Sequence, residues 1–202
     1  MLFTRFLPTG QYNYVNELEF DSNIKTDNDN KALCRDAISQ VKKASKRKLP
    51  YYYFFSNIEG TVFTSVSKLP LYTAGLVLTP NDVFDYGNIA FTGITCIDID
   101  HLNESDIQTI KSYCCKDNLI KYCASSASGK GCFILYDVGV ENQTDQNIIK
   151  DLNNDFYGRV YSLLHKRDFI VDQITSSIFC CRFESYDPEP YNNFGETNEW
   201  RS

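Results

Sequence analysis

The segment Gly93–Asp100 constrains the fold more than any other, because it predicts a buried β-strand that ends in two carboxylates. The β-branched Ile97 and Ile99 suit a pleated, buried position. Side chains alternate between the two faces of a strand, so Asp98 and Asp100 should point away from these isoleucines. Two adjacent carboxylates on an apolar strand repel each other and lose solvation, and a divalent cation between them would relieve both costs. The alternative is a pair of solvated aspartates at a strand end.

From residue 93 onward, the hydrophobic pattern predicts the element order β-α-β-β-α-β. It places the strands at 93–100, 119–124, 132–138 and 168–172, with one helix after the first strand and a longer helix after the third. This order is that of the split βαβ, or ferredoxin-like and RRM-like, fold. In such a fold the helices cover one sheet face and leave the other open for a site. A further strand is expected at 178–184.

The chain is long enough, at 202 residues, for one well-packed domain, and its 43% hydrophobic content predicts a real core. We expect an α+β fold with an N-terminal α/β part at 1–92, the RRM-like core at 93–188 and a C-terminal tail at 189–202. Within the first part, a helix should end before Pro50, and a β-hairpin should follow over 51–66.

Composition limits the compartment and the partners. No run of about 18 apolar residues exists, and the N-terminus lacks a signal-peptide pattern, so we expect no membrane partner. The eight cysteines show no C-x-x-C spacing, which favours reduced thiols over a zinc site and predicts a cytoplasmic protein. The net charge of −6 argues against non-specific wrapping of nucleic acid. A basic run at Lys42–Lys48 is followed by aromatic residues at Tyr51–Phe55, and this combination gives weak support for binding of single-stranded nucleic acid. The same aromatic residues also suit a buried β-strand.

The predicted topology brings three polar features to one end of the sheet. The first strand should lie between the third and fourth strands and run antiparallel to both. Its end, with Asp98 and Asp100, should therefore lie beside the beginning of the fourth strand, where Asp172 adds a third carboxylate. The turn at 125–131, which precedes the third strand, should lie on the other side. The sequence thus predicts a metal site beside a polar turn.

This turn has the composition of an anion-binding loop. Gly129 and Gly131 allow backbone N–H groups to converge on an anion, Ser126 and Ser128 can donate hydrogen bonds, and Lys130 adds a positive charge. The G-x-x-x-x-G-K-[ST] spacing of a Walker A loop is absent. The alternative is an ordinary hairpin turn. Beside three acidic residues, the turn is better interpreted as a cradle for a triphosphate.

Arg182 has two interpretations. Its planar guanidinium suits a phosphate contact. It suits an ion pair with Glu184 or Asp187 equally well.

Four segments together resemble the archaeo-eukaryotic primase superfamily, and most closely the primase-like BT4734-like or VirE N-terminal domains of phages and mobile elements. The resemblance covers roughly Lys48 to Asn193. The segments are Asp98-Ile-Asp100, Ser126-x-Ser-Gly-Lys-Gly131, Val171-Asp172 and Arg182-Phe-Glu-Ser-Tyr186-Asp-Pro188.

The resemblance implies roles for these residues. It makes Asp98, Asp100 and Asp172 the ligands of catalytic Mg²⁺ or Mn²⁺, and it makes the serine–glycine–lysine turn and Arg182 the contacts of the incoming nucleotide. Many catalytic members carry a histidine on the strand after this turn, where the present chain has Cys132-Phe133. The zinc-binding element of some primases has no counterpart.

The implied function is that of a DNA primase or primase-polymerase, a nucleotidyltransferase of phage or mobile-element DNA replication. Its substrates would be nucleoside triphosphates and a single-stranded DNA template. The sequence contains no P-loop, so unwinding would require a partner such as a separate replicative helicase. The alternative is a non-catalytic primase-like domain that binds nucleic acid or a replication partner, which the missing histidine and the acidic balance favour.

Overall fold

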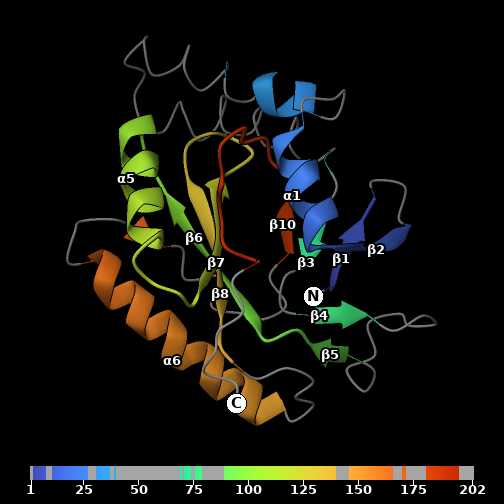
Figure 1. The fold of residues 1–202 in the computed structure, drawn as a ribbon, viewed down its shortest axis with the longest axis vertical. Helices are drawn as coiled ribbons and strands as arrows, with labels where there is room; N and C mark the ends of the chain where they lie inside the picture. The colour runs from blue at the N-terminus through green and yellow to red at the C-terminus, as the bar shows by residue number, and fades with distance from the viewer. Residues whose placement is uncertain are drawn as a thin grey trace, which may run out of the picture.

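The computed structural model is an α+β protein with antiparallel sheets (Figure 1). Within the described parts of the chain, no helix combines the length and the apolar character needed to cross a membrane. The predicted hairpin at 51–66 lies outside the described residues, as does most of the helix predicted to end before Pro50. The structure describes residues 2–7, 11–26, 31–36, 39, 69, 71–73, 76–78, 89–139, 146–165, 170–171 and 181–195.

Two larger sheets and one small strand pair organise these elements: a five-stranded sheet in the order β11-β7-β8-β6-β9, a four-stranded sheet in the order β10-β3-β1-β2, and the pair β4-β5. The elements are β1 (Leu2–Phe6), β2 (Tyr12–Asn16), α1 (Glu17–Lys25), β3 (Leu71–Thr73), β4 (Leu76–Leu78), β5 (Ile89–Phe91), β6 (Ile94–Asp100), α5 (Glu104–Cys114), β7 (Ile120–Ser125), β8 (Cys132–Asp137), α6 (Gln146–His165), β9 (Ile170–Val171), β10 (Cys181–Phe183) and β11 (Tyr191–Asn192).

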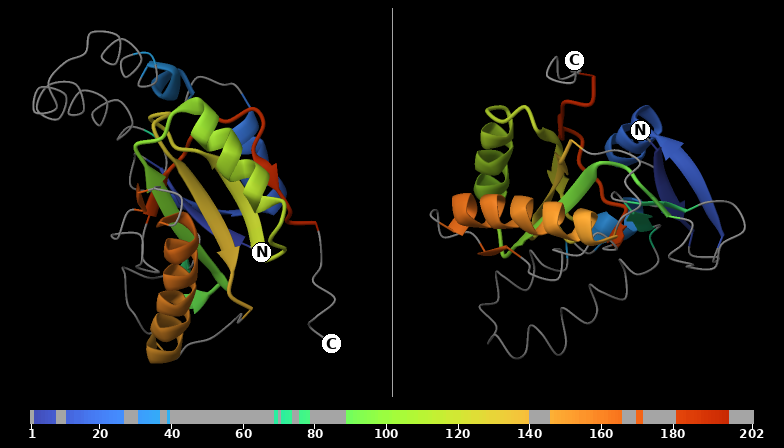
Figure 2. Two further views of the ribbon diagram at one scale, coloured as in Figure 1. Left: turned by 90° about the vertical axis from the view of Figure 1, so that its left-hand side faces the viewer. Right: turned by 90° about the horizontal axis from the view of Figure 1, so that it is seen from below.

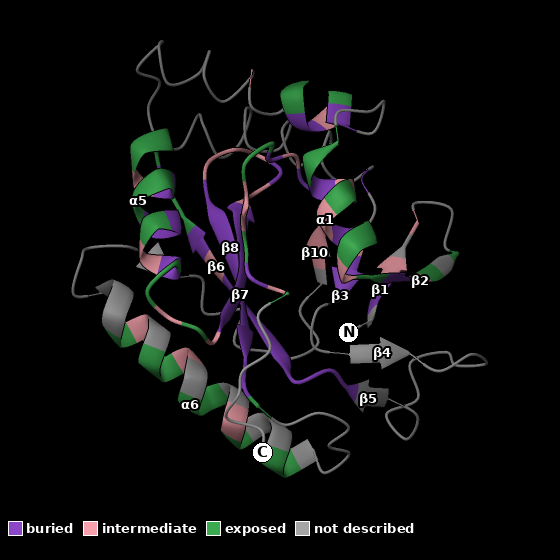
Figure 3. Ribbon diagram, viewed as in Figure 1, coloured by how far each residue is buried: buried purple, intermediate pink, exposed green. Residues whose placement is uncertain are grey.

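The strand β6 lies at the position expected from the sequence, between β8 and β9 and antiparallel to both. Ile99 is opposite Cys132 on one side and opposite Val171 on the other. The central strands β6, β7 and β8 are buried along nearly their whole length (Figure 3), which explains their near-continuous apolar sequences. The register therefore fixes which residues of β6 reach the end of the sheet.

Helices α5 and α6 cover one face of the five-stranded sheet (Figures 1 and 2). Ile97 and Ile99 belong to the apolar cluster on this face, which also contains Ile107 and Ile110 of α5. The helix α5 begins directly after β6 because Asn103 caps it: its side chain accepts from the backbone of Asp106 at 3.0 Å, in a reciprocal capping box. The helices thus lie on the isoleucine side of β6, as the alternation predicts.

The opposite face is covered by α1 and by the four-stranded sheet rather than left open (Figure 2). Ile94 and Cys96 of β6 pack there with Phe3 of β1, Phe20 of α1 and Tyr72 of β3. The strand expected at 178–184 is present as β10, but it pairs with β3 in this second sheet. Only the last residues of β6, which include the two aspartates, extend toward solvent on this face.

Candidate active site at the end of strand β6

Two aspartates, Asp98 and Asp100, lie at the end of β6, and we call this pair the acidic strand end. Both lie on the face opposite Ile97 and Ile99. The side chain of Asp98 is 25% exposed, whereas Asp100 is exposed. The end of the strand therefore presents two neighbouring carboxylates at the boundary between the core and solvent.

The backbone turns sharply after this strand end. His101 has φ 58°, in the left-handed region, where histidine is one of the better-tolerated residue types. The next residue, Leu102, donates its N–H to the carbonyl of Lys130 at 2.8 Å. This hydrogen bond ties the chain that leaves Asp100 to the turn between β7 and β8.

The glycine turn, Ser126–Gly131, is held by hydrogen bonds of its own. The N–H of Gly129 donates to the carbonyl of Ser126 at 2.9 Å, and the N–H of Ser126 donates to the carbonyl of Gly131 at 2.8 Å. Gly129 has φ 67°, which glycine adopts at little cost. The Oγ atom of Ser128 lies 3.3 Å from both the Oγ of Ser126 and the backbone N of Lys130. Hydrogen bonds within the chain therefore fix the conformation of the turn.

Gly131 brings the turn into direct contact with the acidic strand end. A Cβ atom at this position would lie 2.5 Å from the carbonyl oxygen of Ile99 and 3.2 Å from an Oδ1 atom of Asp100. Glycine is thus required here by the close approach of two backbones. The predicted meeting of the turn and the acidic pair is present in the structure.

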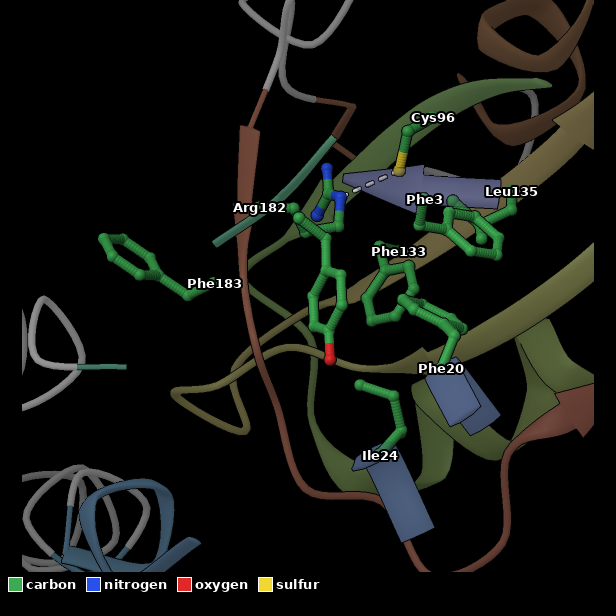
Figure 4. A pocket seen from close by; sticks show the side chains of 9 residues that line it. Phe3, Phe20, Ile24, Cys96, Phe133, Leu135, Arg182 and Phe183 are labelled. Atoms are coloured by element: carbon green, nitrogen blue, oxygen red, sulfur yellow. Dashed lines mark hydrogen bonds between the residues drawn. The ribbon is translucent and has the colours of Figure 1, made fainter. Parts of the chain in front are cut away.

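Arg182 reaches the acidic strand end from β10. Its guanidinium forms an ion pair with Asp98. Its Nε donates to the sulfur of Cys96 at 2.8 Å, and the guanidinium lies 5.1 Å from the ring centroid of Phe133 (Figure 4). Cys96 and Phe133 also line a small cavity of about 10 Å³, room for about one water molecule. Among the described residues, the acid that pairs with Arg182 is therefore Asp98, rather than Glu184 or Asp187.

Those two acids have other cationic partners. Glu184 is 1% exposed and accepts hydrogen bonds from Lys31 at 2.6 Å, from Tyr72 at 2.7 Å and from the Nε of Arg5 at 2.9 Å. Burial lowers the pKa of Lys31, and the carboxylate of Glu184 opposes this shift. Burial raises the pKa of the Tyr72 hydroxyl, and the same carboxylate raises it further. Glu184, which directly follows β10, therefore ties that strand to β1 and β3.

Asp187 is the second buried acid, at 4% exposure. It forms an ion pair with Lys111 of α5 at 2.7 Å and accepts the backbone N–H of Ser125 at 2.7 Å. The sequence reasoning treated Glu184 and Asp187 only as alternatives for Arg182. No local signal marked these two acids as buried, because their cationic partners Lys31 and Lys111 lie 153 and 76 residues away in the sequence.

The donor set at the strand end fits a hard divalent cation, because carboxylate oxygens are the ligands that Mg²⁺ and Mn²⁺ prefer. Within the described parts of the chain, no group of three or more histidine, cysteine or acidic side chains is placed to hold a metal ion. The third predicted ligand, Asp172, lies outside the described residues, although β9, which precedes it, pairs with Ile99 and Asp100. Its role as a ligand stays a prediction.

Comparison with known proteins gives one match. A family model described as BT4734-like, N-terminal domain, matches residues 87–191, just over half of the chain. The match includes the acidic strand end, the glycine turn and Arg182, and it confirms the resemblance to BT4734-like domains drawn from the sequence. No curated protein and no solved structure matches the chain significantly.

Proposed function

The chain belongs to the family of BT4734-like N-terminal domains, and from this membership and the geometry of the strand end we propose that it is a metal-dependent nucleotidyltransferase of the DNA primase type. The observation that carries the proposal is the contact of Gly131 with Ile99 and Asp100, which joins an acidic pair to a lysine-bearing glycine turn. We also propose that β6, α5, β7, β8, α6 and β9 form an RRM-like core of the archaeo-eukaryotic primase superfamily. The order of these elements and the order of their strands support this assignment.

The residues divide into two roles in this proposal. Asp98 and Asp100, with Asp172, would hold Mg²⁺ or Mn²⁺, whose chemistry at such a cluster is activation of a 3′-hydroxyl and stabilisation of leaving pyrophosphate. Lys130 and the backbone of the glycine turn would bind the triphosphate of the incoming nucleotide. The guanidinium of Arg182 would exchange its contact with Asp98 for one with a phosphate oxygen.

Positioning is the main contribution of the protein in such a reaction. The turn is already held by internal hydrogen bonds, and the strand end is paired on both sides, so neither needs to reorganise before nucleotide binds. We propose single-stranded DNA as the template. A separate replicative helicase would supply unwinding.

A non-catalytic domain that binds nucleic acid or a replication partner is the second candidate. Two contacts favour it. Arg182 already neutralises the carboxylate of Asp98, so a metal ion is not the only relief for its charge. The ring beneath Arg182 is Phe133, only 2% exposed, which offers a substrate no hydrogen bond.

Incorporation of labelled nucleotides on a single-stranded DNA template, in the presence of Mn²⁺ or Mg²⁺, separates the two candidates. The double variant Asp98→Asn/Asp100→Asn should abolish incorporation and Mn²⁺ binding. Asp117→Asn is the matched control, because this carboxylate lies at the other end of the sheet, where its Oδ2 accepts the hydroxyl of Tyr136 at 2.6 Å. Absence of metal-dependent incorporation by the wild type would refute the enzyme and leave the binding domain.

A further inference from the structure

One short segment joins both halves of the candidate site. Its first residue, Arg182, contacts the acidic strand end, and its last, Asp187, contacts Ser125, the last residue of β7, which directly precedes the glycine turn. Between them, Glu184 anchors the segment to β1 and β3. What Asp187 does for the turn is an inference that rests on the proposed function, because it concerns the nucleotide side of that site.

The contacts of Asp187 are concentrated on Ser125. One oxygen, Oδ2, accepts both the backbone N–H of Ser125 at 2.7 Å and its hydroxyl at 3.0 Å. The ammonium of Lys111 lies 2.7 Å from the same oxygen and also donates to the carbonyl of Glu189 at 2.7 Å. The backbone N–H of Asp187 donates to the carbonyl of Ile24 in α1 at 3.1 Å. Ser125 and Lys111 therefore hold the carboxylate of Asp187, and Ile24 holds its backbone, so Ser125 cannot shift without breaking charge-assisted hydrogen bonds.

A second contact holds the turn from the same side. Ala127, in the middle of the turn, is 7% exposed and belongs to a small apolar cluster with Cys34 and Leu69. Tyr186, the neighbour of Asp187, packs against this cluster. A carboxylate thus fixes the residue directly before the turn, and apolar packing fixes the centre of the turn.

We infer that Asp187 is a positioning residue, which holds the glycine turn in the conformation that receives the nucleotide's phosphates. A turn that is ordered before binding loses less conformational freedom when the ligand arrives, so nucleotide affinity depends on it. A purely structural Asp187, which only balances Lys111, would affect stability and leave the turn unchanged.

Variants of Ser125 test the inference without breaking the buried ion pair. Ser125→Ala removes the hydroxyl contact with Asp187. Ser125→Thr keeps a hydroxyl group that can make this contact, and the β-branched threonine is well tolerated in a strand. Peptide-level hydrogen exchange over 125–132 should be several-fold faster in Ser125→Ala and restored in Ser125→Thr. In the incorporation assay, Ser125→Ala should raise the KM for nucleotide several-fold, with kcat and Mn²⁺ affinity unchanged.

Asp187→Asn tests the carboxylate itself and should loosen the turn further, by about tenfold in exchange rate. Because it leaves Lys111 without a counter-charge, the double variant Asp187→Asn/Lys111→Met removes both charges and serves if the single variant does not fold. Asp117→Asn, at the other end of the sheet, controls for a general loss of stability. Exchange of the turn equal to wild type in the Ser125 and Asp187 variants, or equally raised in Asp117→Asn, would overturn the inference. If the wild type binds no nucleotide, the proposed function fails and hydrogen exchange still decides whether Asp187 orders the turn.

Discussion

Replacing Gly131 with alanine tests the contact between the glycine turn and the acidic strand end directly. The new Cβ would lie 2.5 Å from the carbonyl oxygen of Ile99, whereas ordinary contact begins at 3.4 Å, so the two backbones must separate by about 0.9 Å. Ile99 cannot move freely, because it is paired with Cys132 on one side and Val171 on the other. Overpacking of this kind costs about 1–3 kcal/mol, and we expect the free energy of unfolding to fall by that amount.

Gly139→Ala provides the matched control. Gly139 follows β8 at the opposite end of the sheet with φ 80°, and a Cβ there would meet nothing within 4 Å. Its replacement should cost about 1–2 kcal/mol through the left-handed backbone alone. The two variants therefore lose similar stability for different reasons, and only Gly131→Ala displaces the strand end that carries Asp100.

Two measurements distinguish these effects. Urea denaturation gives the loss of stability, and calorimetric titration with Mn²⁺ gives the affinity of the acidic strand end. We expect weaker Mn²⁺ binding in Gly131→Ala and wild-type binding in Gly139→Ala. Wild-type stability in Gly131→Ala would refute the close approach itself, and equal Mn²⁺ affinity in both variants would separate the turn from the acidic pair.

Four further results are expected. Arg182→Met should raise Mn²⁺ affinity about 10- to 100-fold, since Asp98 loses a competing charge-assisted hydrogen bond worth about 1.5–3 kcal/mol; an unchanged Kd in calorimetry would show that the arginine and the metal do not compete. Lys130→Ala should weaken nucleotide binding by about 1–3 kcal/mol with little change in Tm, and equal affinities would remove this lysine from the site. Glu184→Gln should lower the free energy of unfolding by about 3–5 kcal/mol, because neighbouring cations lose their counter-charge; a loss below about 1 kcal/mol in urea would contradict the buried network. Burial raises the pKa of the Cys34 thiol from 9.0 to about 11, so the folded state keeps a proton that the unfolded chain releases, and stability should fall as the pH rises from 9 to 11. Cys34→Ala should flatten this decline, and an identical slope in denaturation at several pH values would exclude the thiol as its source.

The parts of the site that the sequence predicted are those with local signals. Alternation along β6 predicted the faces of Ile97 and Asp98, and the element order predicted which strands would flank β6. Gly131 was identified because glycines let backbone N–H groups of a turn converge on an anion, and the structure shows that it also permits the close approach of Ile99. Each of these features depends on neighbours in sequence or on a general rule of topology.

The parts that the sequence did not predict depend on distant partners. Arg182 and Asp98 are 84 residues apart, and Glu184 is 153 residues from Lys31. The hydrophobic pattern of the sequence does not indicate such pairs, because only tertiary packing brings these side chains together. The four-stranded sheet was also missed, since its strands have at most five residues and carry little pattern. Phe133, which the sequence presented only as a missing histidine, proved to be the ring beneath Arg182.

Four acids lie in or beside the segment 182–187: Asp98, Asp100, Glu184 and Asp187. They differ in how deeply they are buried, and this difference locates the candidate site. Glu184 is 1% exposed and bound by two cations and a tyrosine, and Asp187 is 4% exposed and bound by a lysine and two backbone N–H groups. Removing either carboxylate from these partners would leave buried charge uncompensated, so neither can turn to an external ligand. The side chain of Asp98 is 25% exposed and lies beside the guanidinium of Arg182, and Asp100 is exposed. A ligand can therefore approach the acidic strand end from solvent, where it would compete with the partly exposed ion pair between Arg182 and Asp98. This is where we propose that chemistry on a phosphate takes place.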